Sequence, residues 1–364
     1  MSLREISGTR RQAGSGSARL RVALLPERIG ANLSPCASIR MHPYFEALRQ
    51  RGEIDYRVLF PEELERYRPH VIAWHRISVP SLKELQVLQA VAGRLEATLL
   101  YDLDDNLLDM DSHGEGETYR HMTEAVSGSL KVAHEVWCST PALAQRVTRE
   151  SAGSVHALAN ALDPSIWDLG RAFAPCRPSD TFRLLYMGTR THEEDFAFLS
   201  RVMDQLQQSD PGAFSLTVIG IRHHDRADAP WMSVLSPQNF IGASYPGFVH
   251  WLQQQHGFSV GVAPLVESAF NACKSHIKVL DYAAIGLPTV ASAVPAYVHA
   301  LRDGQGCWLV PNTVEDWCAV LTQLRGEPET LDRLTRESAA LVGPAPFEVA
   351  LQARRMRLHA LSVA

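Results

Sequence analysis

Two lysines and a serine lie just before an apolar segment in the stretch FNACKSHIKVLDYAAIGLPTVAS, residues 270–292. Ser275 is of a type that caps helices well, so the pattern predicts a helix over 276–285. The unbonded N–H groups and the dipole at the start of such a helix attract an anion. Lys274 and Lys278 flank that start, and lysines are costly near a core without an opposite charge. The spacing therefore predicts a site for an anionic group.

A second polar turn, GTRTH at 188–192, follows an apolar strand pattern and precedes a helical one. Gly188 lets the backbone approach a ligand closely, and Thr189 can donate a hydrogen bond. Arg190 can pair with a phosphate through two parallel hydrogen bonds, and His192 can cap the helix or contact phosphate. An ordinary strand–helix turn is the alternative. The turn gains weight because we expect its strand beside the lysine-rich helix.

Acidic side chains gather where the predicted strand TLLYDLDDN, residues 98–106, ends. Asp102 and Asp104 have the D-x-D spacing that can hold Mg²⁺ or Mn²⁺ on a nucleotide diphosphate. Asp104 or Asp105 can instead accept a proton from a hydroxyl group. Capping of the next helix, together with Asn106, is the structural alternative.

Two further strand ends carry polar residues. In AWHRIS, residues 73–78, His75 can contact a sugar or act as a base, and Arg76 can bind phosphate or an acceptor. A histidine at a strand end also serves structure alone. After the first strand, Ser34 and Arg40 can contact phosphate or an acceptor, which is the weakest of these signals.

Composition bounds the class of protein. The 364 residues suit two domains, and 46% hydrophobic with 21% charged residues describes a soluble globular chain. A net charge of −5 argues against a nucleic-acid binder. Six scattered cysteines without a C-x-x-C pair, no membrane-spanning segment and no signal peptide predict a cytoplasmic protein. Two histidines and Asp225 in IRHHDRAD lack a well-placed third ligand, so we predict a solvent loop and no metal site.

Short apolar runs alternate with helical patterns, which predicts parallel sheets covered by helices on both faces. Thr140 is a predicted cap for one helix, with Pro141 in its first turn. The alternation restarts after a proline-containing connection, so we predict an α/β protein with two Rossmann-like domains facing a central cleft. The predicted segments are a disordered tail at 1–18, a first domain at 19–165, a second domain at 166–345, and a helix at 346–364 packing back on the first domain.

The stretches LLYMGTRTHEEDF (184–196), VWCSTPALAQRV (136–147) and 260–292 resemble GT-B-fold glycosyltransferases, the bacterial enzymes that build polysaccharides from nucleotide sugars. The acidic segment LLYDLDDNLLD also resembles that group, ANALDP lies where such enzymes pass between domains, and NFIGA at 239–243 lies near the nucleotide base. The resemblance implies that the first domain faces the acceptor with Asp104, Asp105 and His75. It implies that the second domain binds the donor diphosphate and ribose through Gly188, Thr189, Arg190, His192, Asn271, Lys274, Ser275, Lys278 and Asp281, with Asp281 on the ribose hydroxyls.

The chain departs from the family's large retaining branch at one position. That branch carries two glutamates separated by seven residues, the first near the sugar and the second on the ribose. Here Asp281 takes the second position and Cys273 stands at the first, where it cannot act as a carboxylate. Asn271 can offer hydrogen bonds to the sugar instead. The chain therefore resembles a divergent member, and the retaining or inverting outcome stays open.

The resemblance implies a metal-independent enzyme without a cofactor that moves a hexosyl or deoxyhexosyl group to a glycan or lipid-linked acceptor. We expect it in the cytoplasm, with peripheral contact to the inner face of the membrane allowed, and without nucleic-acid partners. Three alternatives stay open. They are a metal-dependent GT-A-like transferase that uses Asp102 and Asp104, a nucleotide-sugar epimerase, and a non-catalytic partner subunit with the GT-B fold.

Overall fold

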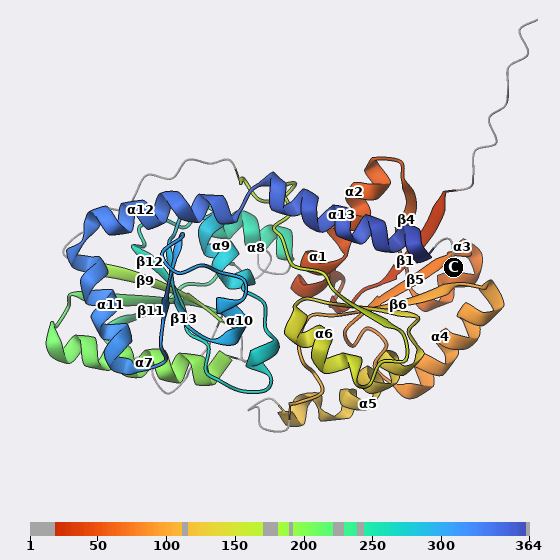
Figure 1. Ribbon diagram of the computed structural model, residues 1–364, viewed down its shortest axis with the longest axis horizontal. Helices are drawn as coiled ribbons and strands as arrows, with labels where there is room; N and C mark the ends of the chain where they lie inside the picture. The colour runs from red at the N-terminus through yellow and green to blue at the C-terminus, as the bar shows by residue number, and fades with distance from the viewer. Residues whose placement is uncertain are drawn as a thin grey trace, which may run out of the picture.

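The computed structural model describes residues 19–110, 116–169, 181–188, 192–220, 229–238 and 244–361. Two six-stranded parallel sheets form two lobes that lie side by side, each with helices on both faces (Figure 1). The strand order is β4-β1-β5-β6-β7-β8 in the first sheet and β11-β10-β9-β12-β13-β14 in the second. This architecture confirms the predicted α/β class with two Rossmann-like sheets.

The first sheet and its helices come from the first half of the chain. The strands are β1 (Leu20–Leu25), β4 (Ile54–Val58), β5 (Val71–His75), β6 (Thr98–Leu103), β7 (Glu135–Cys138) and β8 (Ser154–Ala157). The helices are α1 (Pro35–Arg40), α2 (His42–Gln50), α3 (Leu64–Tyr67), α4 (Leu82–Leu95), α5 (Gly116–Val132) and α6 (Pro141–Thr148). A short antiparallel pair, β2 (Arg28–Ile29) and β3 (Asn32–Leu33), follows β1.

The second sheet repeats this alternation. Its strands are β9 (Phe182–Met187), β10 (Phe214–Ile219), β11 (Met232–Val234), β12 (Val260–Ala263), β13 (Thr289–Ser292) and β14 (Cys307–Val310). Its helices are α7 (Glu193–Ser209), α8 (Tyr245–Leu252), α9 (Ile277–Ala284), α10 (Pro295–Val298), α11 (Val314–Gly326) and α12 (Pro328–Ser338), followed by α13 (Pro344–Leu361). Short 3₁₀ turns cover Pro61–Glu63, Asn271–Cys273 and Ala339–Leu341. None of the helices in these described ranges has both the length and the apolar character needed to cross a membrane.

Aromatic side chains fill both faces of the first sheet. Trp74 and Tyr101 stack with ring centroids 5.2 Å apart on one face. On the other face, Phe45 meets Trp137 edge-on at 6.0 Å. The indole N–H of Trp74 donates to Ser129 Oγ at 3.2 Å, so its polar atom is satisfied inside the core. A sheet buried on both faces explains why its strands read as continuous apolar runs.

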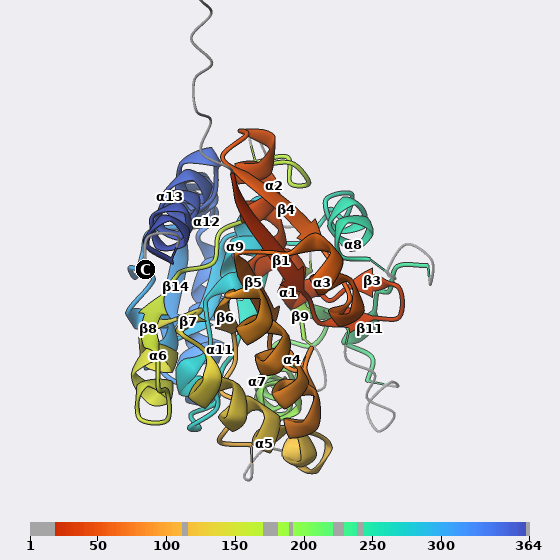
Figure 2. The same ribbon diagram turned by 90° about the vertical axis from the view of Figure 1, so that its right-hand side faces the viewer.

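The last helix, α13, returns from the second sheet to the first. In Figure 1 it continues from α12 along the upper side of the molecule, and Figure 2 shows both helices on the same side. Phe347, Leu351 and Leu358 are buried in the hydrophobic cluster of the first sheet. Arg354 lies fully buried with its guanidinium 3.8 Å from the ring centroid of Tyr44, so α13 is part of the first sheet's core.

Candidate functional site

The two halves of the chain meet at a loop between β12 and α9. We call residues 269–275 the bridging loop. They belong to the second half of the sequence, yet Phe270 and Cys273 are buried in the hydrophobic cluster of the first sheet. Phe270 is 2% exposed and Cys273 is 5% exposed, so both side chains are as buried as ordinary core residues.

Hydrogen bonds from the first half fix the backbone of the bridging loop. Asn106 Nδ2 donates to the carbonyl of Ala269 at 3.2 Å. Thr140 Oγ1 donates to the carbonyl of Cys273 at 2.8 Å. Both donors follow strands of the first sheet, β6 and β7. The predicted anion-binding segment is therefore held by both halves of the molecule.

The expectation that Ser275 caps α9 is wrong. The helix begins at Ile277, and His276 occupies the cap position without a side-chain hydrogen bond. Lys274 is extended, with φ −69° and ψ 152°, because the chain leaves a 3₁₀ turn there before it enters the helix. Ser275 Oγ instead accepts a hydrogen bond from Asn160 Nδ2 at 2.9 Å.

Tyr282 holds α9 against the second sheet. Its hydroxyl accepts the Met187 N–H at 2.8 Å and donates to the Val262 carbonyl at 3.1 Å. Gly261 leaves space for the ring, since a Cβ at that position would lie 2.4 Å from a Tyr282 carbon. The helix is thereby fixed in rotation, which determines where the side chain of Lys278 points one turn earlier.

Two predicted site residues on α9 have buried polar atoms without a hydrogen-bond partner in the described part of the chain. These atoms are Lys278 Nζ and Asp281 Oδ1. Burial lowers the pKa of Lys278 to about 8, against the opposing charge of Asp195. Burial raises the pKa of Asp281 to about 8, although Lys278 opposes the shift. Residues three apart on a helix lie on one face, so the two groups border the same space.

Asp195 connects α7 to this cluster. Burial raises its pKa to about 6, and the charge of Lys278 and the Val266 N–H oppose that shift. Its Oδ1 accepts the Val266 N–H at 2.7 Å, and its Oδ2 lies 2.6 Å from His192 Nδ1. His192 occupies the cap position of α7 without a side-chain cap bond, and its ring orients Asp195.

Lys274 points across the interface. Its Nζ lies 3.3 Å from Asp105 Oδ1 and 4.3 Å from the centroid of the Phe270 ring. The residue is only 8% exposed. Asn271 is also buried, and its Nδ2 donates to the Val266 carbonyl at 2.8 Å while its Oδ1 has no partner among the described residues.

Gly188 ends β9, where its N–H donates to the Ile219 carbonyl at 3.0 Å. The neighbouring Gly220 has φ 93°, and a Cβ there would lie 2.4 Å from the Gly188 carbonyl oxygen. The backbone at this strand end is thus closely packed. Thr189 and Arg190, and the predicted loops at 221–228 and 239–243, lie outside the described residues.

The polar residues of the first sheet gather around His75, which is fully buried at the end of β5. Its Nε2 lies 3.6 Å from Asp102 Oδ1 and 3.9 Å from Asp104 Oδ1, and burial lowers its pKa. Arg76 donates to Asp104 at 3.1 Å. Burial alone would raise the pKa of Asp104, but the charges of Arg76 and His75 outweigh it and hold the pKa well below its usual range. Asp105 lies 3.6 Å from Arg76 Nη1, with 22% of its side chain exposed.

Arg40 and Asp102, expected to contact a ligand or a metal, are paired with each other. Arg40 donates to both carboxylate oxygens of Asp102, at 3.0 and 2.7 Å, and to the carbonyl of Leu158 and Asn160 Oδ1, at 2.5 and 2.9 Å. Both side chains are buried, so this pair ties β6 to the segment that leaves the first sheet. Ser34 is likewise buried, and its Oγ accepts the Ala37 N–H as the cap of α1 at 3.1 Å.

Arg76, expected to bind phosphate or acceptor, is instead paired with acidic neighbours. Besides Asp104, its Nη1 lies 3.3 Å from Cys36 Sγ and its Nε lies 3.5 Å from Glu27 Oε1. It has a left-handed backbone, with φ 49°. In the described ranges, no group of three His, Cys, Asp or Glu side chains is placed to hold a metal ion. The paired carboxylates and the two-sheet fold overturn the GT-A-like alternative.

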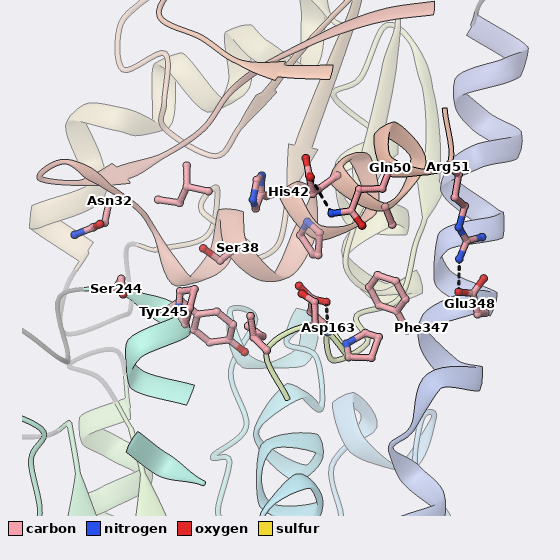
Figure 3. A pocket seen from close by; sticks show the side chains of 18 residues that line it. Asn32, Ser38, His42, Gln50, Arg51, Asp163, Ser244, Tyr245, Phe347 and Glu348 are labelled. Atoms are coloured by element: carbon pink, nitrogen blue, oxygen red, sulfur yellow. Dashed lines mark hydrogen bonds and ion pairs between the residues drawn. The ribbon is translucent and has the colours of Figure 1, made fainter. Parts of the chain in front are cut away.

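A cavity of about 560 Å³ lies between the two halves, beside residues 163–166, which follow the first sheet in the chain (Figure 3). His42 lines it from α2, Tyr245 from the start of α8, and Phe347 from α13. None of the predicted donor residues that the structure describes lines it. Burial raises the pKa of Tyr245, and the charge of Asp281 adds to the shift, so the cavity adjoins α9.

Sequence reasoning missed the roles of Asn160, Asn106 and the packing of Cys273. ANALDP marked only the crossing between the halves, and Thr140 was identified only as a helix cap. That cap is confirmed, since Thr140 Oγ1 accepts the Leu143 N–H at 3.1 Å. Its second bond joins residues 133 positions apart, and no local pattern indicates such a contact.

Comparisons with known proteins agree with this architecture. The sequence model of the family described as glycosyl transferases group 1 matches residues 181–326. No curated protein sequence matches the chain significantly. The fold is similar to that of the Anabaena protein HepE, solved with UDP and glucose, with a TM-score of 0.64 at 11% identity, covering 94% of this chain and 100% of that one.

Two more solved structures share the fold. A glycosyltransferase from Rickettsia africae gives a TM-score of 0.63 at 10% identity, covering 94% of this chain and 98% of that one. Sucrose-phosphate synthase from Thermosynechococcus elongatus gives 0.58 at 16% identity, covering 89% and 80%. At these identities the likeness to solved structures shows the fold, and the family match covers only the second sheet with helices α7 to α11. The chain has the GT-B fold, and its residues 181–326 match the group 1 glycosyl transferases.

Proposed function

We propose that the chain transfers a sugar from a nucleotide diphosphate sugar to a glycan or lipid-linked acceptor in polysaccharide biosynthesis. The observation that carries the proposal is a pair of buried atoms on α9, Lys278 Nζ and Asp281 Oδ1, which have no hydrogen-bond partner among the described residues. Buried charges without partners are costly, so such groups are typical of sites where a ligand supplies the partner. A diphosphate matches the ammonium group, and a ribose diol matches the carboxylate.

The start of α9 supports the same ligand. No side-chain hydrogen bond from His276 caps the helix, and the Val279 N–H donates to the His276 carbonyl at 2.9 Å, which leaves the N–H groups of Ile277 and Lys278 for an anion. Lys274 lies four residues before Lys278 and adds a second positive charge. The charge of the diphosphate grows as its bond to the sugar breaks, and fixed positive groups stabilise that state more than the bound substrate.

The first sheet supplies the carboxylates for the acceptor in this proposal. Asp105 is more exposed than Asp104, at 22% against 13% of the side chain, and it lies next to Lys274. The acceptor oxygen forms a bond to the anomeric carbon as the bond to the diphosphate oxygen breaks, and Asp105 takes the hydroxyl proton. Asp104 is paired with Arg76, and His75 is fully buried. Neither side chain is therefore as free as Asp105 to meet the acceptor, and both lie in the cluster behind it.

The location and the donor base follow from the same proposal. Nucleotide sugars would reach the site from the cytoplasm, and a lipid-linked acceptor would bring the protein to the inner face of the membrane. The HepE structures include complexes with UDP and with UDP-glucose, which makes uridine nucleotides the first probes to try here.

The test is calorimetric titration of UDP, GDP, ADP and CDP into wild type, Lys278→Ala and Asp281→Asn, each with and without EDTA. We expect one nucleotide to bind wild type with EDTA present, and Lys278→Ala to weaken binding at least about tenfold, since charge-assisted hydrogen bonds are the strong ones. Lys83→Ala changes an exposed lysine on α4 and is the matched control.

Three results would contradict the proposal. Binding that requires a divalent metal and is equal in Lys278→Ala and Lys83→Ala would remove α9 from the site. Release of an isomerised nucleotide sugar without any acceptor would instead favour an epimerase. Tight binding without turnover across a broad acceptor panel would favour a non-catalytic subunit.

A further inference from the structure

We propose that Thr140 and Asn160 are positioning residues that fix the bridging loop, so that donor affinity depends on side chains of the first half that do not touch the donor. The proposal rests on the proposed function, because it concerns how the donor site is assembled. Both residues lie outside the stretches expected to bind a ligand. Each makes one hydrogen bond within its own half and one to the bridging loop.

Thr140 bonds in both directions. Its Oγ1 accepts the Leu143 N–H at 3.1 Å, which caps α6, and donates to the Cys273 carbonyl at 2.8 Å. A hydroxyl group can do both at once, and a methyl group can do neither. The residue after Cys273 is Lys274, so this bond fixes the backbone directly before a lysine expected on the diphosphate.

Asn160 joins Ser275 to a buried ion pair. Its Oδ1 accepts from Arg40 Nη1 at 2.9 Å, and its Nδ2 donates to Ser275 Oγ at 2.9 Å. Arg40 is itself held by both oxygens of Asp102. One donor and one acceptor therefore fix the orientation of the Asn160 amide. Through Arg40 and Asp102, the end of the bridging loop is connected to β6.

Apolar anchoring explains why the loop stays in this position. Phe270 and Cys273 lie in the first sheet's hydrophobic cluster, next to residues such as Leu107 and Leu143. A carboxylate at position 273 would be buried in this cluster, where the nearby Arg146 is already paired with Asp109 and Glu150, which is unfavourable. The thiol thus fits a loop that is docked on the first half, where the resembling enzymes carry a glutamate toward the sugar.

The experiment compares Thr140→Val with Thr313→Val. Thr313 caps α11 through its Oγ1, which accepts the Asp316 N–H at 3.1 Å, and this cap lies away from the bridging loop. Both changes remove a threonine cap, but only the first removes a bond to Cys273. Thr140→Ser keeps the hydroxyl group and serves as the rescue variant.

Two readouts are used. Amide hydrogen exchange over 269–275 reports the loop without any ligand, and titration of UDP, GDP, ADP and CDP reports the site. We expect Thr140→Val, and separately Asn160→Leu, to speed exchange in the loop and to weaken nucleotide binding about three- to tenfold, the effect of one net hydrogen bond. Thr140→Ser and Thr313→Val should match wild type in both readouts.

The outcomes separate the two proposals. Equal loop exchange and equal nucleotide affinity in Thr140→Val and Thr313→Val would overturn the positioning role while leaving the donor site intact. Faster loop exchange in Thr140→Val, with no nucleotide bound by wild type, would keep the loop's dependence on Thr140 and overturn the donor site. Loss of binding in Thr140→Ser as severe as in Thr140→Val would also contradict the role of the hydroxyl group.

Discussion

Lys278 and Asp281 show how a binding site can be recognised from unpartnered atoms. Each has a buried polar atom without a hydrogen bond in the described chain, and burial moves both pKa values toward about 8. Folding alone is not helped by this arrangement, because each group is less stable charged in the protein than in water. A ligand with a phosphate and a diol would supply the hydrogen-bond partners that Lys278 and Asp281 lack among the described residues.

The raised pKa of Asp281, about 8, predicts a pH-dependent stability. Between its ordinary pKa and about 8 the folded state binds a proton that the unfolded state has released, so the free energy of unfolding falls as pH rises through that window. Asp281→Asn should remove this decrease in the free energy of unfolding. We expect its melting temperature to exceed that of wild type by about 2–4 °C at pH 8 and to match it near pH 4.

Thermal melts from about pH 4 to 8 test this expectation, with Asp168→Asn as a control for an exposed carboxylate. An Asp281→Asn curve parallel to that of wild type would show that Asp281 is ionised in the folded protein at neutral pH.

At the scale of elements, the bridging loop differs most from what its sequence indicates. The apolar alternation predicted the strands and helices correctly, because burial on both faces of a parallel sheet leaves a direct trace in composition. Thr140 was also identified as a cap from local spacing alone. No sequence pattern indicated that Phe270 packs on the first sheet, because an apolar residue in a loop can pack equally well on either half.

The same limit explains the errors at single residues. Ser275 has the side chain of a helix cap, but its oxygen is bonded to Asn160 across the interface. Arg40 has a side chain of the type that binds phosphate, but its guanidinium group donates to both carboxylate oxygens of Asp102. Residue type indicates which bonds a side chain can make, whereas the choice among partners depends on distant segments that the fold brings close.

Restoring the family's acidic residue should harm this protein. Cys273→Glu would place a carboxylate in the hydrophobic cluster of the first sheet, next to Phe270. We expect a loss of stability of at least about 2 kcal/mol and weaker nucleotide binding, because the loop must leave its site to hydrate the charge. Cys273→Ser is the milder control, and thermal melts with nucleotide titration measure both. A gain of transfer activity in Cys273→Glu would instead place this side chain in the cleft.

At the scale of the whole molecule, two chain segments join the halves, and Arg354 on α13 touches both. Its guanidinium donates to the carbonyls of Ala159 and Arg40, at 3.2 Å each, and lies over Tyr44. Burial lowers the pKa of Arg354 to about 10, so it remains charged at neutral pH. Arg354 therefore connects α13 to the segment around Ala159 through which the chain leaves the first sheet.

Arg354→Ala should destabilise the first half more than the second. The change leaves buried carbonyl groups without donors and removes the stacking on Tyr44, so we expect a loss of about 3–5 kcal/mol. Arg355→Ala, which removes a neighbouring arginine that is 41% exposed, is the control. Hydrogen exchange resolves the two halves, and equal destabilisation of both sheets would contradict a local role for Arg354.

The return of α13 sets an order of events during synthesis. The first sheet emerges from the ribosome before the second, but its core still lacks Phe347, Leu351 and Leu358 until α13 is made. The nascent first half must therefore wait, with the apolar faces of α2 and β7 uncovered, while the whole second sheet is translated. The core of the first sheet is therefore completed only after the second sheet has been made.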